Sequence, residues 1–286
     1  MKPLSVIIAS YNAADTLGAQ LHALTTQDWP AGGEIIVADN RSTDSTAELV
    51  SSFANAPIVV QRIQVNDAAG AAHARTAAVT HASYDALAFC DADDVVGESW
   101  VAAMSDALTN NCFVSGPLEY ERLNPTWLAN ARGRILASNE PARFEGTFPI
   151  VSSCNMGIDR ELFERMGGFD SRFERVEDAE LSHRIWNSDI DALHCVAAVV
   201  HYRMRTTNGE IFAQSRSWGR QLPLLRSYVD AGDHRTTIGR IKNWLWLVTS
   251  LPQTINRAGR ARWLHVAGTR IGSIEGRWRL SSVGPT

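Results

Sequence analysis

Three carboxylates directly follow an apolar segment in Ala86-Leu87-Ala88-Phe89-Cys90-Asp91-Ala92-Asp93-Asp94. Asp91 and Asp93 are two positions apart, so an extended backbone places both side chains on one face. Because clustered carboxylates repel one another, we expect a cation between them, and all-oxygen ligands favour Mg²⁺ or Mn²⁺, which commonly bind substrate phosphates. The alternative is a solvated acidic turn in which Asp94 caps the next helix.

Four successive strand–helix units are expected to position these carboxylates. The apolar patterns predict strands over 4–9, 34–38, 58–65 and 87–90, and helices over 13–26, 43–53, 70–81 and 99–109. This alternation is typical of a parallel α/β sheet with right-handed crossovers. Polar residues follow each strand, and ligands of such sheets bind beyond the carboxyl ends of the strands. We therefore expect one polar crevice at that edge.

The pattern becomes less regular after Pro117. It indicates a short helix near 126–136, a strand over 148–158, helices over 159–166 and 178–188, a last strand over 192–200, and helix from 210 onward.

Composition is that of a globular protein, with 286 residues, 45% of them hydrophobic and 20% charged. The four cysteines are far apart and form no C-x-x-C pair, so the sequence indicates neither a zinc site nor a disulfide framework. The N-terminus lacks the apolar stretch of a signal peptide, and no apolar run reaches the roughly 18 residues of a membrane span. We expect a cytoplasmic protein.

Several segments together resemble the family-two glycosyltransferases over roughly residues 4–225. They are Ser5 to Asn12, Glu34 to Asp44, Ala74 to Ala78, Asp91-Ala92-Asp93, Asn155 to Ile158 before Gly167-Gly168-Phe169-Asp170, Glu177 to Leu181, and Val200 to Arg203. The resemblance implies the GT-A fold, a Rossmann-like mixed α/β sheet flanked by helices, and an inverting transferase that uses a nucleoside-diphosphate sugar. It divides the chain into a nucleotide-sugar half (1–118), an acceptor half (119–205) and a helical basic C-terminal region (206–286).

The resemblance also implies a metal site that holds Mn²⁺ or Mg²⁺. Asp93 matches the last position of the family's D-x-D triplet and is the expected direct ligand, while Asp91 would contact ribose or the metal. His201 would add a neutral imidazole, or would be a structural histidine.

By the same resemblance, several residues at or near the strand ends would bind the nucleotide. Asp39 would accept a hydrogen bond from N3–H of uracil or thymine, which favours UDP or dTDP sugars; its alternative role as a helix cap suits Ser42 or Thr43 better. Tyr11 would flank the base or lie in the core, and Ala9 would offer backbone contacts. Arg75 would reach the diphosphate, or would be an ordinary surface arginine.

The general base of an inverting reaction matches the Glu177-Asp178 pair. Asp178 is in the position of the family's base, and Glu177 would hold the acceptor or orient Asp178. The structural alternative is a helix start, where the macrodipole favours acidic residues.

The C-terminal region is basic. From His201 onward there are 14 Lys and Arg against 4 Asp and Glu, whereas the preceding residues have 13 against 27. Apolar residues at helical spacing (Ile238, Ile241, Leu245, Val248, Leu251) and three tryptophans (Trp244, Trp246, Trp263) accompany these cations. The pattern suits an interfacial helix at the inner face of an anionic membrane, near a lipid-linked or cell-envelope glycan acceptor. Alternatively, the stripe packs on the acidic body or on a second copy in a homodimer.

Other functions fit the sequence less well. No nucleic-acid partner is expected. A nucleotidyltransferase, a dehydrogenase or a P-loop enzyme needs a glycine-rich loop after the first strand, and Ser10-Tyr11-Asn12-Ala13 contains no glycine. A catalytically silent sugar-nucleotide or glycan-binding protein is the remaining alternative.

Overall fold

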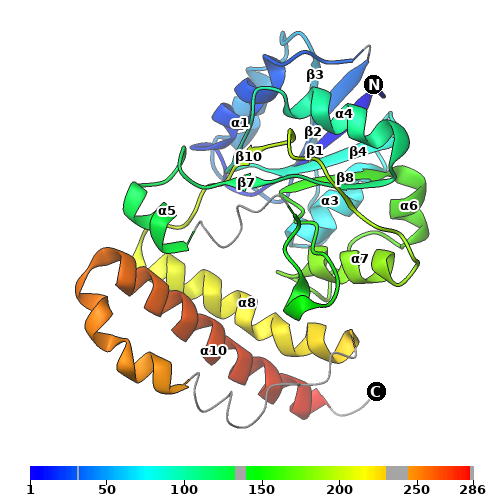
Figure 1. The fold of residues 1–286 in the computed structure, drawn as a ribbon. Coiled ribbons are helices and arrows are strands. Elements are labelled where there is room, and N and C mark those ends of the chain that lie inside the picture. The colour runs from blue at the N-terminus through cyan, green and yellow to red at the C-terminus, as the bar shows by residue number, and fades with distance from the viewer. Residues whose placement is uncertain (31, 133–139, 230–243, 284–286) are drawn as a thin grey trace. The chain divides into compact units, whose positions relative to one another are not determined.

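The computed structural model describes residues 1–30, 32–132, 140–229 and 244–283. It contains two compact units, the first formed by Met1–Glu119 with Leu136–Arg203 and the second by Tyr120–Ile135 with Met204–Thr286. Figure 1 shows the elements of both units.

The centre of the first unit is a seven-stranded mixed sheet of order β3-β2-β1-β4-β8-β6-β9. Strands β3, β2, β1 and β4 are parallel, and β8 runs antiparallel to β4 and β6. The bounds are β1 Leu4–Ser10, β2 Gly33–Asp39, β3 Val59–Gln64, β4 Ala86–Asp91, β6 Phe113–Ser115, β8 Asn155–Asp159 and β9 Leu193–His194. The predicted parallel sheet is confirmed for its first four strands.

Helices cover both faces of this sheet (Figure 1). One apolar cluster joins the sheet to α1 (Leu17–Thr25), α2 (Thr46–Ser51) and α4 (Trp100–Asn110), and a second joins it to α3 (Ala71–Val79), α6 (Arg160–Arg165) and α7 (Glu177–Trp186). Strand β1 contributes to both clusters, because its successive residues Val6 and Ile7 point to opposite faces of the sheet. Burial on both faces explains why its sequence is almost entirely apolar.

The sheet register brings the predicted site segments together. Ser10 pairs with Asp39, and Ala9 pairs with Asp91, so the carboxyl ends of β1, β2 and β4 meet at one edge. A smaller sheet of order β5-β10-β7 continues from that edge; its strands are β5 Val95–Val96, β7 Leu118–Glu119 and β10 Val200–His201. His201 lies opposite Val95, the residue after Asp94. The carboxyl ends of these strands therefore meet at the edge where the sequence predicts the polar residues to gather.

The predicted strand over 148–158 is wrong for its first half. Strand β8 begins at Asn155 because preceding backbone N–H groups bond to side chains of α7 instead of a neighbouring strand. Val151 N–H donates to Ser182 Oγ, and Ser153 N–H donates to Asp178 Oδ2. The predicted strand over 192–200 is likewise two separate pairs of residues, β9 and β10.

The second unit is helical, as predicted, with α5 (Thr126–Arg132), α8 (Asn208–Tyr228), the 3-10 helix η3 (Leu251–Ile255) and α10 (Arg257–Val283). Three glycines spaced by four residues, Gly268, Gly272 and Gly276, lie on α10 where a Cβ would overlap backbone atoms of α8. Gly219 of α8 meets α10 in the same way. These glycines let the two helices approach closely, a packing device that the sequence analysis missed.

Charge also joins α8 to α10. Glu275 accepts from Arg216 and Arg220, with Nε–Oε distances of 2.8 and 2.6 Å. Part of the basic charge of this region is therefore neutralised within the second unit. Ile238 and Ile241 of the predicted apolar stripe lie outside the described residues.

Candidate active site

The acidic segment ends strand β4 and forms the turn before β5. Asp91 is partly exposed, whereas Asp94 is 1% exposed and accepts a hydrogen bond from the backbone N–H of Arg203 at 2.7 Å. The Arg203 side chain donates from Nε to the backbone carbonyl of Asp93, also at 2.7 Å. The turn is thus held by the segment that follows β10.

The alternative role of Asp94 as a helix cap is wrong. Helix α4 begins at Trp100, and its N-cap position is Ser99. Asp94 is instead a buried carboxylate, and burial, together with the charges of Asp91 and Asp93, raises its pKa well above the ordinary value. An acid in this state is costly to ionise unless a cation or a donor approaches it.

Arg75 connects Asp91 of the acidic segment to Glu177, the neighbour of the predicted base Asp178. Its guanidinium donates from Nη2 to Asp91 Oδ1 at 2.5 Å and from Nη1 to Glu177 Oε1 at 3.0 Å. The side chain is 4% exposed, so the alternative of an ordinary surface arginine is wrong. Although burial alone would lower its pKa, the charges of Asp91 and Glu177 raise it. Arg75 therefore stays charged and holds two carboxylates together.

Glu177 and Asp178 begin α7, where the helix N-terminus favours acids. Asp178 accepts from Ser153 N–H at 3.2 Å and from Ala179 N–H at 2.8 Å. Burial raises the pKa of Asp178, and burial together with the Asp178 charge raises that of Glu177 to about 7. A carboxylate with a raised pKa is a stronger base than an ordinary one, which suits proton abstraction near neutral pH.

Cys154 lies beside Asp91 and Asp94, and we call the place where these three side chains converge the acidic corner. One carboxylate oxygen each of Asp91 and Asp94 and the Cys154 Sγ all lie within 4.8 Å of one another. No sequence motif singles out this thiol, because it is far from the carboxylates in the chain. The antiparallel pairing of Cys90 with Asn155 is what brings it there, since Asp91 and Cys154 are the next residues outward.

The corner fits a cation by its own chemistry. Asp94 Oδ2 is buried and has no hydrogen-bond partner among the described residues. Of the predicted metal ligands, Asp91 belongs to the convergent group just described, whereas Asp93 and His201 do not. His201 Nδ1 lies 2.6 Å from Glu119 Oε2, a pairing that would fix the orientation of the ring. The roles of Asp93 and His201 stay predictions.

The predicted nucleotide-binding residues lie along the same strand ends. Asp39 is buried and accepts from Arg62 Nε at 2.7 Å and from Ser42 N–H at 3.1 Å. It does not cap α2, which begins at Thr46, and neither Ser42 nor Thr43 does so either. Tyr11 is 65% exposed, so its alternative place in the core is wrong.

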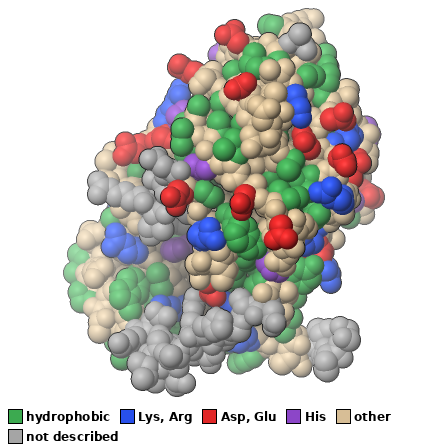
Figure 2. Space-filling model, turned by 45° about the vertical axis from the view of Figure 1, so that its right-hand side comes forward, with side chains coloured by type: hydrophobic (Ala, Val, Ile, Leu, Met, Phe, Trp, Pro, Cys, Tyr) green, Lys and Arg blue, Asp and Glu red, His purple; other side chains and the backbone are tan. Residues whose placement is uncertain are grey.

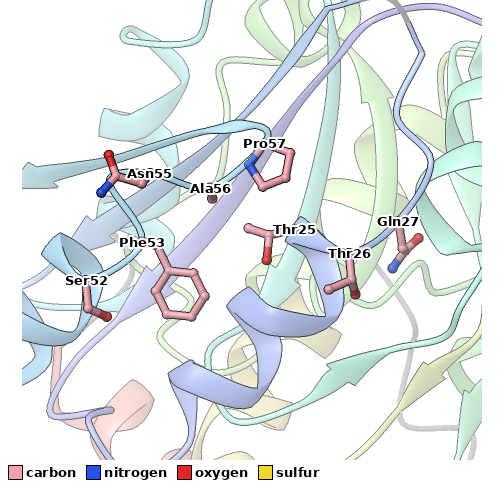
Figure 3. Close-up of a pocket in the computed structure, with 8 residues that line it drawn as sticks. All are labelled: Thr25, Thr26, Gln27, Ser52, Phe53, Asn55, Ala56 and Pro57. Atoms are coloured by element: carbon pink, nitrogen blue, oxygen red, sulfur yellow. The ribbon is translucent and has the colours of Figure 1, made fainter.

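A separate surface hollow of about 590 Å³ lies between the end of α1 and the segment after α2 (Figure 3). It is remote from the carboxyl ends of the strands in the topology, because both helices end at the opposite edge of the sheet. The side-chain donors of Thr25, Thr26, Gln27 and Ser52 bond to backbone carbonyls of their own helices. These groups are therefore already engaged, and we assign no ligand to this hollow.

Surface charge gives no competing site on the face that Figure 2 shows. Acidic and basic side chains are interspersed over the upper part of that view instead of gathering by sign.

Comparison with known proteins gives matches over most of the chain. The family model "Glycosyl transferase family 2" matches residues 5–167. The UDP-Glc:alpha-D-GlcNAc-diphosphoundecaprenol beta-1,3-glucosyltransferase WfaP of Escherichia coli is 36% identical over 246 residues, which cover 82% of this chain and 90% of that protein. WfgD of Escherichia coli, which has the same descriptive name, is 29% identical over 211 residues, covering 70% and 77%.

Solved structures share the fold. The mannosyltransferase PcManGT from Pyrobaculum calidifontis, in complex with GDP-Man and Mn²⁺, superposes with a TM-score of 0.68 at 18% identity, covering 97% of this chain and 88% of that one. TarS residues 1–349 of S. aureus, in complex with UDP-GlcNAc, gives 0.56 at 14% identity, covering 97% and 92%.

Proposed function

The chain belongs to glycosyl transferase family 2, and from that premise we propose that it is an inverting enzyme that transfers a sugar from a nucleoside diphosphate to a hydroxyl group of a lipid-linked or cell-envelope glycan. That it is a glycosyltransferase with the GT-A fold follows from the family and the shared architecture. The donor, the metal and the stereochemistry are parts of the proposal.

The observation that carries the proposal is the connection made by Arg75. Through one buried guanidinium, the acidic turn after β4 and the carboxylate pair at the start of α7 become parts of one site. Transfer from a nucleoside diphosphate needs both parts, since the leaving diphosphate and the acceptor hydroxyl react on opposite sides of the anomeric carbon. A site with only one of them would bind a ligand without transferring it.

Asp178 would act as the general base. It would take the proton of the acceptor hydroxyl as that oxygen attacks the anomeric carbon and the bond to the diphosphate breaks. The N–H groups of Ser153 and Ala179 orient its carboxylate, and the raised pKa makes it a competent proton acceptor. Glu177, fixed by Arg75, would orient the neighbouring Asp178 or hold the acceptor.

A divalent cation, Mn²⁺ or Mg²⁺, would be held at the acidic turn by Asp91 and Asp93, with His201 beside them. When bound, it would offset the charge of the departing diphosphate as a Lewis acid. Arg75 would add a fixed positive charge at the same place, because it already contacts Asp91.

The nucleotide would lie across the ends of β1 and β2. Asp39 would accept a hydrogen bond from the base, with Arg62 and Ser42 fixing its carboxylate, and the exposed Tyr11 ring would flank the base. This arrangement favours UDP or dTDP, as do the UDP-Glc donors in the names of WfaP and WfgD.

The acceptor proposal includes membrane contact at the inner face of the cell membrane. Trp244, Leu245, Val248, Leu251 and Ile255 are all at least 44% exposed, and we call them the apolar patch. Exposed Arg257 and Arg262 follow it in sequence. None of the helices in the described part of the chain has the length and hydrophobicity needed to cross a bilayer. We propose peripheral attachment, with lipid tails below the patch and anionic headgroups beside the arginines.

The test of the proposed function is a donor panel. UDP, dTDP and GDP sugars are offered with and without chelator, and release of the nucleoside diphosphate is measured, first without acceptor and then with a diphosphate-linked lipid glycan. We expect release from UDP or dTDP sugars that the chelator abolishes. If no donor is turned over although nucleotide binds, the silent binding protein is the correct alternative.

A further inference from the structure

A thiol beside two carboxylates distinguishes this acidic corner from an all-oxygen magnesium site. Cys154 is 6% exposed, and its Sγ lies within 4.8 Å of one oxygen of Asp91 and one of Asp94. Three donor atoms that already converge to this degree need only a small closure to surround a metal ion, whose bonds to sulfur and oxygen are about 2.0 to 2.3 Å long.

A second observation points to a ligand at the same place. Asp94 is 1% exposed, and its Oδ2 has no hydrogen-bond partner in the described part of the chain. A buried carboxylate oxygen without a donor is unfavourable unless something else satisfies it. Its other oxygen is engaged with Arg203 N–H, so the orphaned atom is a vacant acceptor on a side chain that is otherwise fixed.

We infer that Asp91, Asp94 and Cys154 form a mixed carboxylate–thiolate site that binds a thiophilic divalent cation of the Zn²⁺ or Cd²⁺ class. The inference rests on the proposed function in one respect: because Asp91 is shared with the proposed Mn²⁺ or Mg²⁺ site, an ion held by the thiolate excludes the catalytic ion and inhibits transfer. Thiolate ligands select soft or borderline ions, whereas carboxylates alone favour hard ones. Cys154 is therefore the residue that determines which ions inhibit.

The neighbouring charges permit such an ion. Asp91, Asp93, Asp94 and the Glu177-Asp178 pair are acidic, and Arg75 and Arg203 are the cations that contact this corner in the described residues. Arg75 occupies Asp91 Oδ1, which leaves the other oxygen of Asp91 for the ion.

The experiment is a cadmium titration of the full chain, read by the ultraviolet charge-transfer absorption of a cadmium–thiolate bond. We expect a saturable band at one equivalent in the wild type and in the control Cys112→Ser, whose cysteine is partly buried elsewhere. Cys154→Ser removes the band, and Asp94→Asn weakens cadmium affinity about tenfold or more. A wild type without the band, or a band that persists in Cys154→Ser, overturns the inference.

Asp94→Asn keeps the test decisive should Cys154→Ser fail to fold. It retains every thiol, so unchanged cadmium affinity in this variant overturns the inference. Transfer assays separate the inference from the proposed function. Turnover of a donor without a cadmium band supports the proposed function and refutes the inference. A Cys154-dependent band without turnover of any donor supports the inference and refutes the proposed function.

Discussion

Asp91 and Glu177 share one buried guanidinium, although they are far apart in the sequence. Arg75 lies 2.5 Å from Asp91 Oδ1 and 3.0 Å from Glu177 Oε1. A planar guanidinium presents donors in a fixed geometry, so it sets the separation of the two carboxylates that it binds. Arg75 is therefore the structural link on which the proposed site depends.

Removal of Arg75 should destabilise the protein strongly. Arg75→Met leaves the buried Glu177 and the partly exposed Asp91 without their shared cation. Breaking a buried ion pair costs about 3–5 kcal/mol. Arg75→Lys should restore part of the stability but not both contacts. Thermal unfolding measures the effect, with Arg165→Met on exposed α6 surface as the control. A Tm of Arg75→Met within the range of the control would contradict the ion-pair network.

Asp178→Asn should reduce transfer by about 100-fold or more while nucleotide affinity is retained, because the amide keeps an acceptor for Ser153 N–H but cannot take a proton. Initial rates and calorimetric titration with UDP measure the two quantities. Asp189→Asn, exposed in the loop after α7, is the matched control. Equal turnover in both variants would place the base elsewhere.

The raised pKa of Glu177 should make the free energy of unfolding depend on pH. Burial and the Asp178 charge raise its pKa from 4.5 to about 7, so the folded state binds its proton more tightly than the unfolded state does. The resulting stabilisation is complete below pH 4.5 and is lost as pH rises through 7. Glu177→Gln has no such titration. Its Tm minus that of the wild type should therefore increase between pH 5 and pH 8, without added metal.

The size of this effect is on the order of 1–3 kcal/mol, since one pKa unit corresponds to about 1.4 kcal/mol. Glu161→Gln, exposed on α6, serves as the control for a neutralised carboxylate. A Tm difference for Glu177→Gln that is constant across this pH range would show that Glu177 is charged throughout.

Replacing a glycine of α10 that lies against α8 should destabilise the second unit. A Cβ at Gly272 would overlap the backbone carbonyl of Arg216, and backbone cannot move aside as a flexible side chain can. Gly272→Ala should lower the Tm of the second unit, whereas Gly209→Ala, where nothing lies within 4 Å, should not. Hydrogen exchange of α8 and α10 locates the effect. Equal protection in the two variants would refute close packing at this point.

Membrane attachment can be tested at the apolar patch. Combined Trp244→Ser, Leu245→Ser and Val248→Ser should reduce sedimentation with anionic liposomes and leave nucleotide binding unchanged. Binding should weaken with salt, because each arginine near an anionic surface contributes about 1 kcal/mol. The wild type in neutral liposomes is the reference. Failure of the wild type to bind anionic liposomes at low salt would exclude peripheral attachment through this patch.

The layered α/β architecture of the first unit follows from local patterns in the sequence. Mainly apolar runs such as Leu4–Ser10 predict strands that are buried on both faces. The helical spacing of Leu17, Leu21 and Leu24 predicts a helix with one face on the core, and all three are buried. The carboxyl ends of the strands were predictable too, since each polar group directly follows its strand. The family motifs could be read from the sequence because each is a short continuous segment at or near the end of a strand or helix.

The contacts between polar groups, in contrast, become visible once the chain is folded. The pairing of Arg75 with Glu177, the approach of Cys154 to Asp91 and Asp94, and the bond from Ser153 to Asp178 each join residues from different segments. The same holds for the irregular chain before β8, whose backbone donors are satisfied by α7. An ion pair or a hydrogen bond leaves no periodic signal in sequence, because it depends on how separate elements pack against one another.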